Sequence, residues 1–298
     1  MNDIRAIKER YALNTQRYTI KKGVIIINAD DGRFVFKKNK GNDIEKLYRY
    51  LDSRGFSHYV PLVKADDYFN VYEYIDDIDT PMEQKAMDIM YVLSLLHNKT
   101  THYKEVDIDD YKKIYEDVNY QIEYYYNYFT NLIEKIETEV YMSPASYLLA
   151  RNISKIFALL SFCKHEIDSW YRLIRGKRKQ RVVTLHNNLD VDHLLANNDM
   201  YLISWEKSKI DMPIYDIYNI YKKHYFDLDF FELLRVYEHK YPLLPEERKL
   251  LFVLLSIPEK LEFTNDNYHN CKVINNYLDY IYKTDELVSN YYATNKVE

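Results

Sequence analysis

The chain has 298 residues, a length that suits one large domain or two smaller ones. Apolar residues make up 47% and charged residues 29%, which supplies both a sizeable core and a charged surface and excludes wholesale disorder. The formal net charge of −5 gives no global reason to bind nucleic acid, and two cysteines cannot build a disulfide framework, so a reducing compartment is expected.

The first part of the chain predicts short strands separated by turn residues. Asp30-Asp31-Gly32 lies between β-branched runs, which is a strong sequence signal for a hairpin. A helix is expected over Asp43–Leu51, because Ile44, Leu47 and Leu51 share one face. The predicted strands are Tyr18–Ile20, Val24–Ile27, Phe34–Lys37, Tyr59–Lys64 and Phe69–Tyr74.

The character of the sequence changes after Tyr74. A polar stretch that contains three aspartates ends at Asp79, and Pro81 opens a helix that is expected to run to His97. We therefore place a β-rich N-terminal lobe in residues 1–78 and a larger helical C-terminal lobe in residues 79–298.

Residues 108–174 carry the spacing of a long helix pair. In the first half apolar residues recur at alternating steps of three and four, which places one buried seam on a helix. Ser143-Pro144 restarts a second helix. An intramolecular pair, inserted in the helical lobe, is preferred over a coiled-coil dimer. The predicted seams are Ile108, Tyr111, Tyr115, Val118, Ile122, Tyr125, Phe129, Leu132 and Ile136, then Tyr147, Ala150, Ile153, Phe157, Leu160, Ile167 and Tyr171.

A strand at Arg181–Leu185 is followed by a loop, His186–His193, and by a strand pair around Leu194-Leu195 and Tyr201–Ser204. The last third of the chain reads as helical. Strands followed by a helical region indicate an α+β fold of two lobes, and on pattern alone a kinase-like layout is one candidate among several.

No segment reads as a membrane helix or a secretory leader. The longest apolar run, Leu250–Leu255, is far short of the ~20 residues that a spanning helix needs. Met1–Lys8 has no apolar core of a signal peptide. We therefore expect a cytoplasmic protein with no membrane partner.

Tyrosine is the outlier of the composition, at 33 residues. A tyrosine-rich binding or cross-linking surface is one interpretation. Because the tyrosines are spread along the chain and many fall at core-facing helical positions, a structural role in the core is preferred.

The loop at 186–195 carries the most informative pattern. Together with Ile203-Ser204-Trp205-Glu206 and Pro213-Ile214-Tyr215-Asp216, it resembles the catalytic core of the aminoglycoside phosphotransferase and choline kinase superfamily. In that family, the sequence motifs of this core are H-G-D-x-x-x-x-N-x-L, I-D-W/F-E and P-x-x-D-L. The spacing is kept here while the key letters are changed.

Further stretches extend the resemblance over nearly the whole chain. Two of them, Leu51–Phe56 with Val60-Pro61 and the tail from Tyr241 to Lys260, resemble the branch of spore-coat protein S. The resemblance implies a bilobal protein-kinase-like fold and suggests a coat role if the source organism forms spores. The stretches are Phe34–Lys37, Leu51–Phe56 with Val60-Pro61, Val71–Tyr74, Leu93–His97, and the tail from Tyr241 to Lys260.

Three positions that carry the family's chemistry are replaced. Asn188 stands at the catalytic Asp, and an amide positions a hydroxyl but takes no proton. His193 and Ser204 stand at the two metal ligands, although Mg²⁺ prefers anionic oxygen. We therefore expect impaired phosphoryl transfer, little hold on Mg²⁺ and at most weak ATP binding.

Nearby carboxylates offer a rescue. Asp190, Asp192 and Glu206 are close in sequence, and Glu206 would share a strand face with Ser204, two residues before it. With one of them as an unusual ligand, a cation could still be held. The preferred interpretation is that they are solvated loop acids.

Other family positions are retained. Lys37 matches the phosphate-binding lysine, and Glu45 on the following helix is weighed evenly between a partner for Lys37 and a surface ion pair. The resemblance gives His186 the role of bracing the loop and makes Asp216 structural. Strand alternation turns Trp205 away from the cleft and into its lobe.

Three functions are compatible with these features. The leading hypothesis is a catalytically impaired kinase-fold protein that binds an unknown protein or small molecule, in the interlobe cleft or the C-terminal lobe. The alternative is an active ATP-dependent phosphotransferase for a small hydroxylated or amine substrate. The third is a nucleic-acid binder through the basic run at 172–181. It is disfavoured against a solvated turn, because no aromatic residues interleave the charges.

Overall fold

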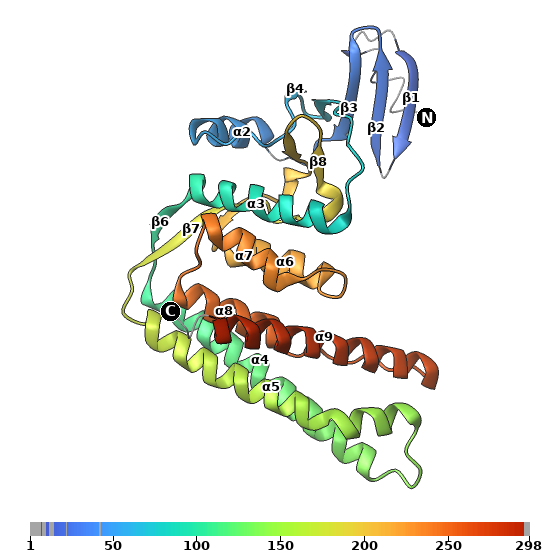
Figure 1. The fold of residues 1–298 in the computed structure, drawn as a ribbon, viewed down its shortest axis with the longest axis vertical. Coiled ribbons are helices and arrows are strands. Elements are labelled where there is room, and N and C mark those ends of the chain that lie inside the picture. The colour runs from blue at the N-terminus through green and yellow to red at the C-terminus, as the bar shows by residue number, and fades with distance from the viewer. Residues whose placement is uncertain (1–6, 8–9, 12–14, 22, 42, 295–298) are drawn as a thin grey trace. The chain divides into compact units, whose positions relative to one another are not determined.

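The computed structural model describes residue 7 and residues 10–11, 15–21, 23–41 and 43–294 (Figure 1). The chain forms two compact units. The first comprises residues 1–100 and 186–209, and the second comprises residues 101–185 and 210–298. The lobe boundary that the sequence places after residue 78 stays a prediction.

The first unit contains a five-stranded antiparallel sheet in the order β1-β2-β3-β5-β4. The predicted hairpin is confirmed, with Ala29 paired to Gly32 across the turn. β4 starts later than predicted, and Tyr59 makes only a single bridge to Leu202. The strands are β1 (Thr15–Lys21), β2 (Val24–Ala29), β3 (Gly32–Lys38), β4 (Leu62–Ala65) and β5 (Phe69–Glu73).

The two faces of this sheet differ in chemistry. One face carries the buried cluster Ile7, Ile25, Ile27, Phe36, Phe69 and Val71. Because side chains alternate along a strand, Lys37 lies on the opposite face. The strand register sets Lys37 opposite Asn70 and sets Val35 opposite Tyr72. One side of the sheet thus builds the core, and the other presents the lysine.

The first unit also holds α2 (Ile44–Ser53), α3 (Met82–Thr100), the 3-10 turns η1 (Val191–His193) and η2 (Trp205–Lys207), and the hairpin β8 (Leu194–Ala196) and β9 (Met200–Leu202). The strand predicted through Ser204 was wrong at its end, since β9 stops at Leu202. Ser204 has a φ of 72°, a left-handed conformation that breaks the extended chain.

The second unit is mostly helical. A three-stranded sheet, in the order β10-β7-β6, adjoins its helices. β6 and β10 escaped prediction because they are short and lack an alternating pattern. The elements are β6 (His102–Glu105), α4 (Ile108–Glu137), α5 (Pro144–Ile174), β7 (Lys179–Leu185), β10 (Lys209–Asp211), α6 (Ile214–His224), α7 (Phe230–Lys240), α8 (Pro245–Ser256) and α9 (Asn267–Thr294). No helix in the described part of the chain is both long and apolar enough to cross a membrane.

The helix pair is confirmed, with α4 packed against α5 within the chain (Figure 1). Val118, Ile122 and Phe129 are buried on α4, as the spacing predicts. Ser143 caps α5 by accepting from the backbone of Ser146. Ile108 departs from the predicted seam, with 41% of its side chain exposed.

The seam predicted for α5 was right only in part, since Leu160 and Ile167 are buried as predicted. Tyr147 is 59% exposed, whereas the buried stripe runs through Ile156, Cys163 and Trp170. α5 packs against α8 and α9 as well as against α4. Phe157 meets Tyr126 of α4, so the predicted residues form one flank of a wider buried sector. A helix covered on several sides does not reveal its main face through one apolar stripe.

Candidate functional site

Lys37 is the centre of a compact polar cluster in the first unit. Its Nζ lies 2.5 Å from Oε1 of Glu206 and donates to Oγ of Ser204 at 3.1 Å. The side chains of Lys37 and Glu206 are only 25% and 13% exposed. The structure thus brings together the predicted phosphate lysine, one predicted metal position and one rescue carboxylate.

The turn at Ser204 explains why Glu206 reaches the lysine. The sequence placed Ser204 and Glu206 on one side of a strand, but the chain leaves the strand after Leu202 and enters η2. The left-handed backbone at Ser204 turns the chain, and both side chains converge on the same ammonium. Ser204 and Glu206 do face one side, because of a turn. The preferred interpretation of Glu206 as a solvated loop acid was wrong, since its side chain is 13% exposed and paired with Lys37.

Two tyrosines that were not predicted as site residues lie near enough to Glu206 to be affected by its charge. Tyr48 of α2 is 6% exposed, and Tyr72 of β5 stands opposite Val35 on the face of Lys37. Burial is the main cause that raises the pKa of both tyrosines, and the negative charge of Glu206 raises each pKa further. Strand alternation in the stretch Val71–Tyr74 was the signal that could have identified Tyr72.

The side chains of Asn188 and His193 both contact nearby backbone carbonyl oxygens. The carbonyl oxygen of Asn188 accepts from Nδ1 of His193 at 2.6 Å, which assigns the proton to Nδ1. The amide of Asn188 makes a long contact of 3.4 Å to the carbonyl oxygen of Ser204. These two predicted site residues therefore join the turn that carries Ser204.

His186 braces the same turn. It is fully buried, and its Nε2 donates to the carbonyl oxygen of Ile203 at 2.8 Å. Its ring lies 4.7 Å from that of Trp205, centroid to centroid, with an edge-on geometry. This placement agrees with a structural role in holding the loop.

The remaining predicted residues lie elsewhere. Glu45 is exposed on α2, and the carboxylate that contacts Lys37 is that of Glu206. Asp190 precedes η1, and Asp192 lies within it. Asp216 is buried in the first turn of α6, in the second unit. Among the described residues, no group of three or more His, Cys, Asp and Glu side chains could hold a metal ion.

We expect Trp205 to tolerate Phe far better than Ser. Its side chain is 2% exposed, packs on His186 and Phe56, and donates Nε1–H to the carbonyl oxygen of Leu202. Trp205→Ser should lower the free energy of unfolding by about 3–5 kcal/mol, because it leaves a cavity. Trp205→Phe should lose less, since it keeps a ring. Urea denaturation measures both, and equal stabilities would contradict the assignment.

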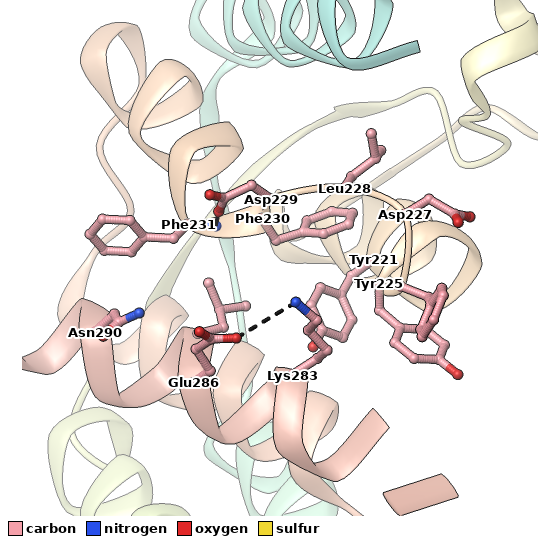
Figure 2. Close-up of a pocket in the computed structure, with 12 residues that line it drawn as sticks. Tyr221, Tyr225, Asp227, Leu228, Asp229, Phe230, Phe231, Lys283, Glu286 and Asn290 are labelled. Atoms are coloured by element: carbon pink, nitrogen blue, oxygen red, sulfur yellow. Dashed lines mark hydrogen bonds and ion pairs between the residues drawn. The ribbon is translucent and has the colours of Figure 1, made fainter. Parts of the chain in front are cut away.

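A cavity of about 280 Å³ lies in the second unit, between α9 and the segment that joins α6 to α7 (Figure 2). The rings of Tyr221 and Phe230 line it, and Lys283 reaches into it beside Glu286. Lys283 pairs with Glu286 at 3.7 Å, and Asp229 caps α7. Its main charged groups are thus already engaged. A second cavity, of about 530 Å³, lies beside the end of α5.

Comparison with solved structures shows which known fold this architecture resembles. The aminoglycoside phosphotransferase from Alicyclobacillus acidocaldarius subsp. acidocaldarius DSM 446 is similar over 99% of this chain and 96% of its own, with a TM-score of 0.68 and 11% identity. The chain therefore has the fold of the aminoglycoside phosphotransferases. This finding confirms the predicted α+β fold, with its small β-rich lobe and its larger helical lobe.

A second solved structure extends the comparison to a nucleotide complex. The AMP-bound complex of a spectinomycin phosphotransferase is similar over 96% of this chain and 94% of its own, with a TM-score of 0.51 and 12% identity. No protein-family model matches the sequence, and no curated protein sequence matches it. At these identities the likeness establishes the fold.

Proposed function

We propose that this protein is a catalytically impaired member of the kinase-like phosphotransferases that acts as a binding module. The observation that carries the proposal is the ion pair between Lys37 and Glu206. Lys37 stands where the family's lysine meets the nucleotide phosphates, and a carboxylate already neutralises it. A bound triphosphate would have to displace Glu206 and would be repelled by it.

The donor set at the metal positions does not suit Mg²⁺. Ser204 offers a neutral hydroxyl, and His193 offers an imidazole whose Nδ1 is bonded to Asn188. Mg²⁺ favours anionic oxygens in octahedral geometry. Glu206 is the carboxylate that converges with Ser204, and Lys37 holds it. We therefore propose weak ATP binding that gains little from Mg²⁺.

The alternative is an active ATP-dependent phosphotransferase for a small hydroxylated or amine substrate. Glu206 favours it, because a carboxylate beside Lys37 becomes a metal ligand if it leaves the lysine. Similar solved structures are named as phosphotransferases, one with AMP bound. A role in the spore coat rests on the resemblance of two stretches to spore-coat protein S, Leu51–Phe56 with Val60-Pro61 and the tail from Tyr241 to Lys260.

Transfer of the γ-phosphate tests the proposal. The protein is incubated with labelled ATP and Mg²⁺ across a panel of aminoglycosides, amino alcohols and sugars, with Lys37→Ala as the control. We expect no label on any acceptor above the level of Lys37→Ala. Turnover that disappears in Lys37→Ala would overturn the loss of catalysis and move the alternative ahead.

We expect Glu206→Gln to strengthen ATP binding. The substitution keeps the size of the side chain and removes the charge that neutralises Lys37, so the ammonium becomes available to phosphate. Ligand at a hundred times its dissociation constant stabilises a protein by about 2.7 kcal/mol, so thermal melts with ATP resolve the change. The wild type should shift little, and equally with Mg²⁺ or EDTA.

Two controls sharpen this measurement. Glu83→Gln removes one charge from an exposed position at the start of α3 and should leave the ATP shift unchanged. The double variant with Lys37→Ala and Glu206→Gln should not show the stronger ATP binding that is expected of Glu206→Gln alone. If wild type shows a large shift only with Mg²⁺, and Glu206→Gln abolishes it, then Glu206 is a metal ligand and the active enzyme is the better account.

A further inference from the structure

The larger cavity of the second unit has an apolar inner wall. It lies where the end of α5 meets β6, β7 and the start of α8, and its volume is about 530 Å³. Tyr111, Trp170 and Ile174 line it and are at most 4% exposed. Small-molecule sites are typically ~300–1,000 Å³, mostly apolar, with few polar groups. The wall is therefore suited to contact the aromatic or alkyl part of a small molecule.

Two ion pairs line the cavity, and within each pair the positive and the negative charge cancel. Arg181 pairs with Glu247 through two nitrogens, one of them 2.9 Å from Oε1, and the two side chains are 10% and 5% exposed. Lys177 pairs with Glu246. Arg181 also donates to the carbonyl oxygen of Pro242 at 2.9 Å. These groups are satisfied by the protein and leave no net charge.

Lys179 supplies the remaining charge. It lines the cavity and is exposed at the start of β7, while its carbonyl oxygen accepts from the Tyr111 hydroxyl that forms part of the wall. Glu105 stands opposite it in the β6–β7 register. Within the described residues, no carboxylate lies within ion-pair distance of its ammonium. Among the described residues, one cation without an ion pair thus borders the apolar wall of the cavity, with Glu105 as its cross-strand neighbour.

The chain around Lys179 carries three further cations outside the cavity lining. Arg172 is exposed in the last turn of α5, and Arg175 and Arg178 are exposed between α5 and β7. Clustered charges of one sign raise the local concentration of counter-ions and steer their approach. Of the basic run at 172–181, expected from its sequence to be a solvated turn, Lys177, Lys179 and Arg181 line the cavity.

We propose that this cavity binds an amphipathic anion, a small molecule with an aromatic or alkyl body and one anionic group. The body lies against Tyr111 and Trp170, and a carboxylate or sulfonate pairs with Lys179. The site belongs entirely to the second unit and is independent of the cluster around Lys37. It assigns the protein a ligand-binding site beyond its proposed function.

Binding of anilinonaphthalene sulfonate to the full chain tests the proposal, with fluorescence as the readout. We expect one dye per chain. Lys179→Glu should weaken binding at least about tenfold, because two opposite charges in contact become two like charges. Lys155→Glu makes the same charge change at an exposed position of α5 outside the cavity lining, and should change binding less than about twofold.

The second part of the binding experiment varies the chemistry of the probe. N-phenylnaphthylamine, which has the rings without the sulfonate, should bind at least about tenfold more weakly. Decanoate and naphthoate are tested as competitors, and displacement by either identifies the accepted body as alkyl or aromatic. Circular dichroism checks that each variant remains folded. Equal dye binding by Lys179→Glu and Lys155→Glu, or no displacement by either competitor, would overturn the proposal.

Discussion

The protein should unfold cooperatively between pH 10 and pH 12. Tyr221 and Tyr241 are 1% and 4% exposed, and burial raises the pKa of each to about 12, from 10 in the unfolded chain. A raised pKa favours the protonated phenol in the folded state. Its stabilising contribution is therefore complete below pH 10 and is lost as the pH rises towards 12.

The expected loss is large compared with ordinary stability. Two pKa units correspond to about 2.7 kcal/mol for each of these tyrosines, of which about 2.3 kcal/mol is lost by pH 12. Burial raises the pKa of Tyr48, Tyr237 and Tyr280 as well, so that they stay protonated until the chain unfolds. Because domains are typically stable by only ~5–15 kcal/mol, the sum suffices to unfold the chain.

Absorbance of the phenolates and circular dichroism, recorded together against pH, measure this transition. We expect the buried tyrosines to ionise together with the loss of helix signal. Tyr241→Phe removes one titrating group and should reduce the slope of stability against pH, although it loses the hydrogen bond from Thr101. Tyr120→Phe, at a position 71% exposed, should not. Gradual ionisation with an unchanged helix signal would contradict the account.

Phe129→Asp should destabilise the second unit more than the same change at Leu132 or Tyr120 of α4. Phe129 is fully buried, and its ring stacks on Tyr277 of α9 with 6.2 Å between centroids. Removing such a ring costs about 3–5 kcal/mol, and an unpaired buried carboxylate adds to that loss. We expect a loss of about 5 kcal/mol or more in urea denaturation at neutral pH.

Two neighbouring positions calibrate this result. Leu132→Asp, at a half-buried site of the same helix, should cost less, and Tyr120→Asp should stay within about 0.5 kcal/mol. The deficit of Phe129→Asp should shrink on acidification, because protonation removes the buried charge. Equal losses at Phe129 and Tyr120 would mean that α4 does not pack in solution as described.

The candidate site was only partly open to prediction from sequence. The spacing of the motifs identified Lys37, Ser204 and Glu206 as candidate site residues. Such positions keep their order along the chain even where the residue types have changed. The sequence offered Glu45 as the partner of Lys37 and favoured a solvated loop acid for Glu206, whereas Glu206 forms the ion pair with Lys37. That pairing depends on the left-handed backbone at Ser204, and the conformation of one non-glycine residue leaves no periodic signal.

The sequence by itself determined the elements and their order. Alternation, helical spacing and turn residues are local properties, and they placed the hairpin, the long α4 and the restart of α5 at Ser143-Pro144. Only the tertiary structure decided what those elements face. α5 buries a sector wider than one stripe because three helices cover it, and part of the basic run lines a cavity because α8 packs against α5. Such contacts join residues far apart in the chain, so no local pattern encodes them.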